Sequence, residues 1–103
     1  YYVGIDSMRI NGVTLPIPPD IWSIDKNGKG GAIIDSGTTL SFFRAGAYNV
    51  IVDAVKEAVN YPLAPPTAGL PLCYNVSGIE FPKLPRISIV FKGNSEAVFS
   101  PFP

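Results

Sequence analysis

The alternation of apolar and polar residues near the N-terminus predicts a strand that turns back in a hairpin. Tyr1, Val3 and Ile5 fall on one face at a period of two, and the strand continues to the residue before Asn11. Asn11 and Gly12 predict the turn itself, because both residue types tolerate the positive φ angles of a type I′ turn. The chain is then expected to return antiparallel over 13–15, until a proline-rich segment ends the pairing.

Apolar residues at three- and four-residue spacing predict one amphipathic helix over 44–59. The apolar stripe consists of Tyr48, Ile51, Val52, Val55, Ala58 and Val59, and the charged residues of the segment lie off it. Such a stripe packs a helix against a sheet. Prolines at 62, 65 and 66 are expected to stop the helix and begin an irregular stretch.

Short apolar runs elsewhere predict further strands. The run 32–35 is typical of a buried central strand that ends in a tight turn at Ser36 and Gly37. Additional strands are expected at 72–74, 86–92 and 97–99, the second with clear alternation. The predicted fold class is therefore mainly β, with one packed amphipathic helix.

Length and composition fit a single folded core. A chain of 103 residues and 11.0 kDa buries on the order of two thirds of its unfolded surface, which suffices for one core and not for two. Hydrophobic residues make up 47% and charged residues 16%, so the chain is too apolar for a disordered tail. The apolar stretches are too short for a transmembrane helix, and the first residues lack the pattern of a signal peptide.

Charge and residue usage exclude several kinds of chemistry. Eight basic and eight acidic residues give zero net charge, which disfavours a nucleic-acid partner held by phosphate neutralisation. The chain contains no histidine. It therefore cannot supply a Ser-His-Asp or Cys-His device, or a zinc site built on imidazole.

Asp35 is the strongest candidate for chemistry. It lies where an apolar run turns, and small hydroxylated residues and one glycine follow it. Apolar walls disfavour the ionised form of a carboxylate, whereas donors from Ser36, Gly37 and Thr38 would stabilise it. If a second carboxylate lay close by, the two would share a proton, so that one activates water while the other protonates a carbonyl oxygen.

The segment Ile-Ile-Asp-Ser-Gly-Thr-Thr at 33–39 resembles the catalytic turn of pepsin-like aspartic endopeptidases, most closely that of the C-terminal lobe. In that turn two hydrophobic residues precede Asp-[Ser/Thr]-Gly-[Thr/Ser]. The agreement covers nearly the whole chain and points to the plant nepenthesin-type branch, including chloroplast-nucleoid-type proteases and xylanase-inhibitor-like proteins. It is also carried by the Asn-Gly hairpin and by the segments 1–5, 15–18, 30–31, 47–48, 72–74, 82–85 and 87–91.

The resemblance implies a role for each residue of the turn. Asp35 takes the place of one of two catalytic aspartates, and Ser36 that of the hydroxyl in the hydrogen-bonded link between the two lobes. Gly37 would give its N–H to the carboxylate, and Thr38 its hydroxyl. Thr39 would lie beside the substrate backbone. The family uses neither a metal nor an organic cofactor, so none is expected here.

The resemblance also implies that residues 1–103 form part of a C-terminal lobe. The N-terminal lobe of the family, which carries its own Asp-Thr-Gly turn, is not found, because no other aspartate of this chain is followed by Ser/Thr-Gly. The hydrophobic-hydrophobic-Gly segment that completes the C-terminal lobe is also not found after residue 72. We expect the parent protein to cleave polypeptides with its N-terminal lobe as partner, and this chain alone to be inactive.

Four other interpretations compete with a two-lobed plant endopeptidase. The first is a non-catalytic binding protein of the same fold, such as a glycosidase (xylanase) inhibitor, against which the intact turn at Asp35 argues. The second is a homodimeric retroviral-type protease, which would need its own hydrophobic-hydrophobic-Gly segment. The third is a plain turn in which Asp35 only caps nearby N–H groups. An exposed phosphorylation motif at the same tripeptide is disfavoured by the apolar run before it.

Two further residues bear on the compartment. In the resembling family a cysteine at the position of Cys73 pairs with one further along, which here would lie past residue 103, and such pairing needs an oxidising compartment. Asn75, Val76 and Ser77 form an N-glycosylation sequon. Both features favour the secretory pathway, extracellular or vacuolar, with a plastid as the alternative. No membrane partner is expected.

Three aromatic residues could serve either the core or the site. Trp22, Phe42 and Phe43 could line a substrate cleft, because proteases of this type prefer bulky apolar side chains. Core packing is expected for at least two of them.

Overall fold

The structure, a computed structural model, describes residues 2–37, 41–67 and 69–100. Tyr1, which belongs to the first predicted strand, lies outside these residues. In chain order the elements are β1 (Tyr2–Val3), β2 (Ile5–Ile10), β3 (Val13–Thr14), the 3-10 helix η1 (Pro19–Trp22), β4 (Ala32–Ile33), α1 (Ala45–Ala58), β5 (Leu63–Ala64), β6 (Cys73–Tyr74), β7 (Ile87–Phe91) and β8 (Glu96–Phe99).

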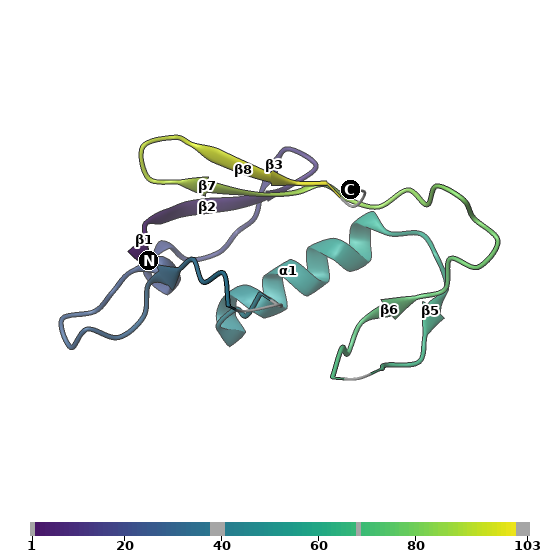
Figure 1. The fold of residues 1–103 in the computed structure, drawn as a ribbon, viewed down its shortest axis with the longest axis horizontal. Coiled ribbons are helices and arrows are strands. Elements are labelled where there is room, and N and C mark those ends of the chain that lie inside the picture. The colour runs from purple at the N-terminus through teal and green to yellow at the C-terminus, as the bar shows by residue number, and fades with distance from the viewer. Residues whose placement is uncertain (1, 38–40, 68, 101–103) are drawn as a thin grey trace.

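The largest sheet is four-stranded and antiparallel, in the order β3-β2-β7-β8 (Figure 1). Strand β2 lies at its centre and pairs with β7 from Ile5 opposite Phe91 to Ile10 opposite Ile87. The predicted hairpin is confirmed, because Asn11 and Gly12 have φ angles of 51° and 81° between β2 and β3. The predicted strands at 86–92 and 97–99 are confirmed as β7 and β8.

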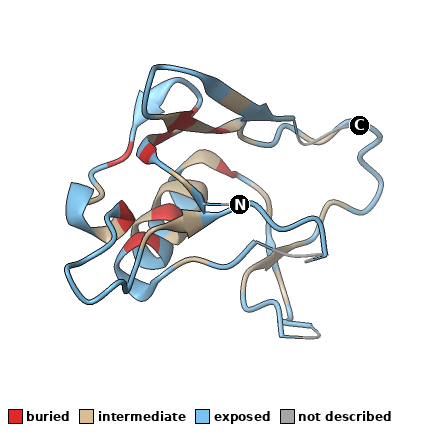
Figure 2. Cartoon of the chain, turned by 60° about the vertical axis from the view of Figure 1, so that its left-hand side comes forward, coloured by how far each residue is buried: buried red, intermediate tan, exposed pale blue. Residues whose placement is uncertain are grey.

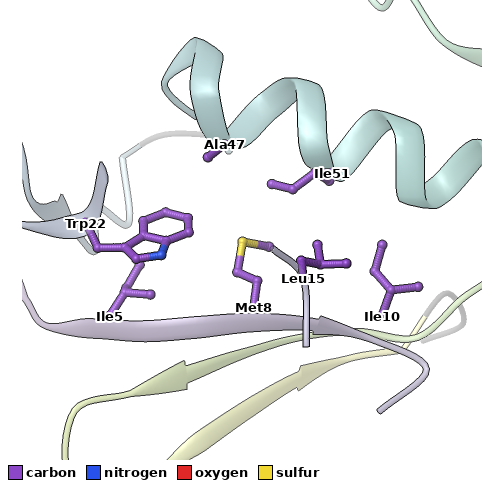
Figure 3. Packing of buried hydrophobic residues seen from close by; sticks show 7 residues of the cluster. All are labelled: Ile5, Met8, Ile10, Leu15, Trp22, Ala47 and Ile51. Atoms are coloured by element: carbon purple, nitrogen blue, oxygen red, sulfur yellow. The ribbon is translucent and has the colours of Figure 1, made fainter. Parts of the chain in front are cut away.

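Helix α1 covers one face of this sheet, and the core lies between them (Figure 3). Met8, from the centre of β2, is only 1% exposed, and Ile51 of α1 faces it across the core. The buried cluster consists of Ile5, Met8, Ile10, Leu15, Trp22, Ala47 and Ile51. Most of the loops around it are exposed (Figure 2).

The predicted helix is confirmed at its bounds to within one residue at each end. Arg44 is the N-terminal cap and Val59 the C-terminal cap, and the N–H of Val59 still donates to the carbonyl oxygen of Val55 at 3.0 Å. No helix in the described part of the chain is long and apolar enough to cross a bilayer.

Most of the predicted stripe of α1 faces the core, and Tyr48 is the exception. Val59 is buried, and Val55 and Ala58 pack against the core cluster. Ile51 is buried as predicted, but Tyr48 is 37% exposed. Ala47 is instead completely buried, and Val50 and Ala54 pack against the core. Alanines carry little weight in a pattern of large apolar residues, so the pattern does not single out Ala47 although it lies in the core cluster.

The prediction that 32–35 forms a buried central strand is wrong. Strand β4 contains only Ala32 and Ile33, and within the described residues it pairs with β1 alone, in a two-stranded ribbon. Ile33 is 59% and Ile34 54% exposed. A strand with one neighbour keeps its other edge and much of its two faces open to solvent. The apolar run therefore does not indicate burial here.

The chain between α1 and β7 forms a small arm that the sequence only half predicts. Strand β6 is expected at 72–74, whereas its partner β5 is not, because prolines at 62, 65 and 66 favour irregular structure there. The two strands pair antiparallel, with Leu63 opposite Tyr74. The arm continues from the C-terminal end of α1, away from the four-stranded sheet (Figure 1).

Candidate functional site

Asp35 lies just beyond the β1–β4 ribbon, which sets its position. The register places Ile33 opposite Tyr2 and Ala32 opposite Val3, and the chain turns immediately after Asp35. The N–H of Gly37 donates a hydrogen bond of 2.9 Å to Oδ1 of Asp35. This is the contact expected from the sequence, and it gives the carboxylate a fixed donor two residues further along the chain.

The space at position 37 favours glycine. A Cβ atom there would lie 3.2 Å from Oδ1 of Asp35, which is tighter than ordinary van der Waals contact. A larger residue would therefore require the Asp35 carboxylate to shift by a few tenths of an ångström. Asp35, Ser36 and Gly37 are all exposed. Thr38 and Thr39, the other residues predicted for the turn, lie outside the described residues.

The Asp35 carboxylate stands at an apolar cavity of about 720 Å³. Its walls come from the ribbon, from the segment just before α1 and from the sheet, so residues far apart in sequence meet beside one carboxylate. Besides Asp35 they include Val3, Ile33, Ile34, Phe42, Phe91 and Phe99. Such a cavity suits an apolar group of a ligand, with the carboxylate as a polar group at its edge.

The three aromatic residues divide between core and cavity. Trp22 is buried in the core cluster and Phe43 packs against it, which confirms the expected core role for two of the three. Phe42 is 78% exposed. All three also contribute to the cavity wall, so Trp22 and Phe43 connect the core to the cavity.

A second carboxylate does not accompany Asp35 in the described part of the chain. None of the other acidic residues lines the cavity. The described residues also contain no group of three His, Cys, Asp or Glu side chains that could hold a metal ion. Among the described residues, the site thus combines the Asp35 carboxylate and the Gly37 N–H with a mostly apolar wall, to which Ser41 and Arg44 add polar groups.

The loop of residues 24–30, which leads into β4, is held together by its own hydrogen bonds. Oδ1 of Asp25 accepts hydrogen bonds from the N–H groups of Asn27 and Lys29, at 2.8 and 2.9 Å. Ile24 forms a β-bridge with Gly30, and the loop leads directly into β4. The Asp25 side chain thus stabilises the conformation of the loop itself.

Replacing Gly30 by alanine is expected to displace this loop. The new Cβ atom would lie 2.4 Å from the carbonyl oxygen of Ser23, and the φ angle of +94° adds about 1–2 kcal/mol of strain for a residue with a side chain. Gly28→Ala is the matched control, because its φ of +78° brings the same strain with nothing within 4 Å. The midpoint temperature of thermal unfolding should be lower for Gly30→Ala than for Gly28→Ala. Equal midpoint temperatures would contradict the predicted clash with Ser23.

Cys73 and Asn75 both lie on the arm, apart from Asp35. Cys73, the one cysteine of the chain, is half-buried, and its thiol donates to the carbonyl oxygen of Leu70 at 3.6 Å. Its predicted disulfide stays a prediction. Asn75 is exposed directly after β6.

Sequence reasoning missed the contribution of β8 to the cavity. Ala97 and Phe99 line it, although more than 60 positions of sequence separate them from Asp35. Their apolar spacing predicts a strand but not the sheet edge on which it lies. Only the pairing of β8 with β7 brings them to the site.

Comparison with known proteins gives consistent matches. Residues 1–102 match the family described as xylanase inhibitor C-terminal. The chain is 30% identical over 92 residues to Protein ASPARTIC PROTEASE IN GUARD CELL 2 of Arabidopsis thaliana, with 88% of this chain and 20% of that protein covered. It is 34% identical over 95 residues to aspartic proteinase nepenthesin-2 of Nepenthes gracilis, with 90% and 22% covered.

A third relative, aspartyl protease family protein 2 of Arabidopsis thaliana, is 30% identical over 95 residues, with 90% of this chain and 20% of that protein covered. The chain therefore spans about a fifth of the length of these curated relatives. No solved structure matches it significantly.

Proposed function

The chain belongs to the xylanase inhibitor C-terminal family, a C-terminal domain of the pepsin-like plant aspartic proteases, and we propose that it supplies one of two catalytic aspartates to an endopeptidase. The aspartate is Asp35. The observation that carries the proposal is its placement: an exposed carboxylate, bonded to the N–H of Gly37 at 2.9 Å, beside an apolar cavity.

The reaction would be peptide hydrolysis by water held between two carboxylates. Two carboxylates a few ångströms apart do not both ionise, so they share one proton. The ionised member takes a proton from water as it attacks the peptide carbon, while the protonated member donates to the carbonyl oxygen. The hydrogen bond from the Gly37 N–H keeps Oδ1 of Asp35 oriented.

The second carboxylate would come from elsewhere in the full-length polypeptide. Because this chain spans about a fifth of its relatives' length, a second lobe in the remainder can supply the partner aspartate. The exposure of Asp35 and Ser36 leaves the turn accessible to such a lobe. The apolar cavity would then receive a bulky apolar side chain of a polypeptide substrate, and neither metal nor cofactor takes part.

A peptidase assay tests the proposal. The full-length polypeptide should cleave an unfolded protein at acid pH, and pepstatin, which mimics the tetrahedral intermediate, should block the cleavage. The isolated 103-residue chain should be inactive because it holds one carboxylate at the site. Acid proteolysis by that isolated chain, if abolished in Asp35→Ala, would overturn the two-lobe mechanism.

An inhibitor of glycosidases is the alternative that the family description raises. The relatives named above are called proteases, and the turn at Asp35 retains its carboxylate and its backbone donor, which together favour the endopeptidase. A xylanase assay separates the two functions. Stoichiometric inhibition of a xylanase without cleavage of any polypeptide would favour the inhibitor.

A further inference from the structure

We propose that Asn75 is an N-glycosylation site, so that the chain reaches its final location through the secretory pathway. Of the asparagines in the chain, only Asn75 is followed two positions later by serine or threonine, with a residue other than proline between. A sequon alone is common by chance, but the fold also places this one at an exposed turn.

Asn75 is presented by a fixed backbone. Its N–H donates to the carbonyl oxygen of Pro62 at 2.7 Å, which extends the β5–β6 pairing by one step. The following residues form a compact turn, in which the N–H of Ile79 donates to the carbonyl oxygen of Val76 at 3.1 Å and Gly78 has a φ of 77°. Asn75 therefore stands at the point where a strand enters a surface turn.

The carboxamide of Asn75 is held at the surface of the turn. Its Oδ1 accepts a hydrogen bond of 3.0 Å from the N–H of Ser77. The oxygen is thereby held toward the turn, and the amide nitrogen occupies the other end of the carboxamide. Asn75 and Ser77 are both exposed. A bulky hydrophilic glycan, which has to remain in water, would fit here without displacing buried side chains.

The position also keeps a glycan away from the cavity beside Asp35. Residues 42–44, just before α1, line that cavity, whereas the arm follows the opposite end of the helix (Figure 1). A helix of 14 residues is about 21 Å long. The glycan and the proposed catalytic turn would therefore not compete for the same space.

The modification needs one co-reactant, a lipid-diphosphate-linked oligosaccharide. Nδ2 of Asn75 forms a bond to C1 of the first sugar, and the C1–oxygen bond to the diphosphate breaks. The lipid diphosphate leaves with the electron pair of that bond, and the amide nitrogen loses one proton. The transfer occurs in the lumen of the secretory pathway. A modified Asn75 would therefore also establish that the chain entered an oxidising compartment, which the predicted disulfide of Cys73 requires.

The experiment is mass spectrometry of the peptide that contains Asn75, from the full-length polypeptide expressed in plant leaf cells. The wild type and Ser77→Thr should carry N-acetylhexosamine and hexose on this peptide, removable by an N-glycan amidase. Asn75→Gln and Ser77→Ala should lose the modification completely. Asn49→Gln, an exposed asparagine on α1 outside any sequon, should retain it.

Ser77→Ala is the decisive variant because it keeps both Asn75 and the backbone N–H of residue 77 that binds Oδ1. An unmodified Asn75 peptide from the wild type would overturn the proposal, and so would a glycan that persists in Ser77→Ala. The readout is a covalent mass and does not depend on peptidase activity. A negative result here and a failed peptidase assay are therefore separate findings.

Discussion

Replacing Asp35 by asparagine is expected to lower kcat of the full-length polypeptide by a factor of about 10²–10⁴, the usual effect of losing a general acid or base. The amide has the shape of the carboxylate, and its oxygen can still accept the 2.9 Å hydrogen bond from Gly37. It cannot take a proton from water. Initial rates on a peptide substrate at acid pH give the measurement, with KM expected to change little because the apolar wall is untouched.

The matched control for this substitution is Asp53→Asn, which removes one carboxylate from the exposed face of α1. Its kcat should equal that of the wild type, and both variants should unfold at the wild-type temperature. If Asp35→Asn kept full activity while Asp53→Asn did too, Asp35 would be only a turn residue that caps the N–H of Gly37.

Replacing Met8 by alanine is expected to lower the free energy of unfolding by about 2–5 kcal/mol. Met8 is 1% exposed at the centre of the cluster between β2 and α1, so its loss removes apolar contacts and leaves a cavity that the sheet and helix cannot close (Figure 3). Urea unfolding of the chain, followed by the fluorescence of Trp22, its single tryptophan, measures the change.

Val13→Ala is the control for Met8→Ala, because it shortens an apolar side chain that is 67% exposed in the hairpin. Its effect should stay within about 0.5 kcal/mol, as for a surface substitution. Equal losses in the two variants would mean that the core between sheet and helix is not the main source of stability.

The fold is predictable from sequence where a short segment determines its own shape. The Asn11–Gly12 turn, the bounds of α1 and the alternation in β7 depend on local geometry, and all three are confirmed. Strand β5 is not predictable in this way. Its two residues pair with β6 only because the chain folds back, and the adjacent prolines conceal it.

The candidate site is predictable in its residues but not in its surroundings. The sequence singles out Asp35 and the donor at Gly37, and the structure contains the hydrogen bond between them, whereas the catalytic role stays a prediction. The prediction that the preceding strand is buried is wrong, and the sequence does not predict that Phe99 lines the cavity. Both depend on which strands lie side by side, and apolar periodicity carries no information about sheet order.

The register of the four-stranded sheet has a consequence for biosynthesis. Because Ile5 at the start of β2 lies opposite Phe91 at the end of β7, nearly the whole chain has to leave the ribosome before the central pairing is complete. Helix α1 can form earlier, since its contacts are local. Until β7 emerges, the apolar side chains of β2 stay exposed to solvent and to chaperones. The chain is therefore most prone to aggregation while it is being translated.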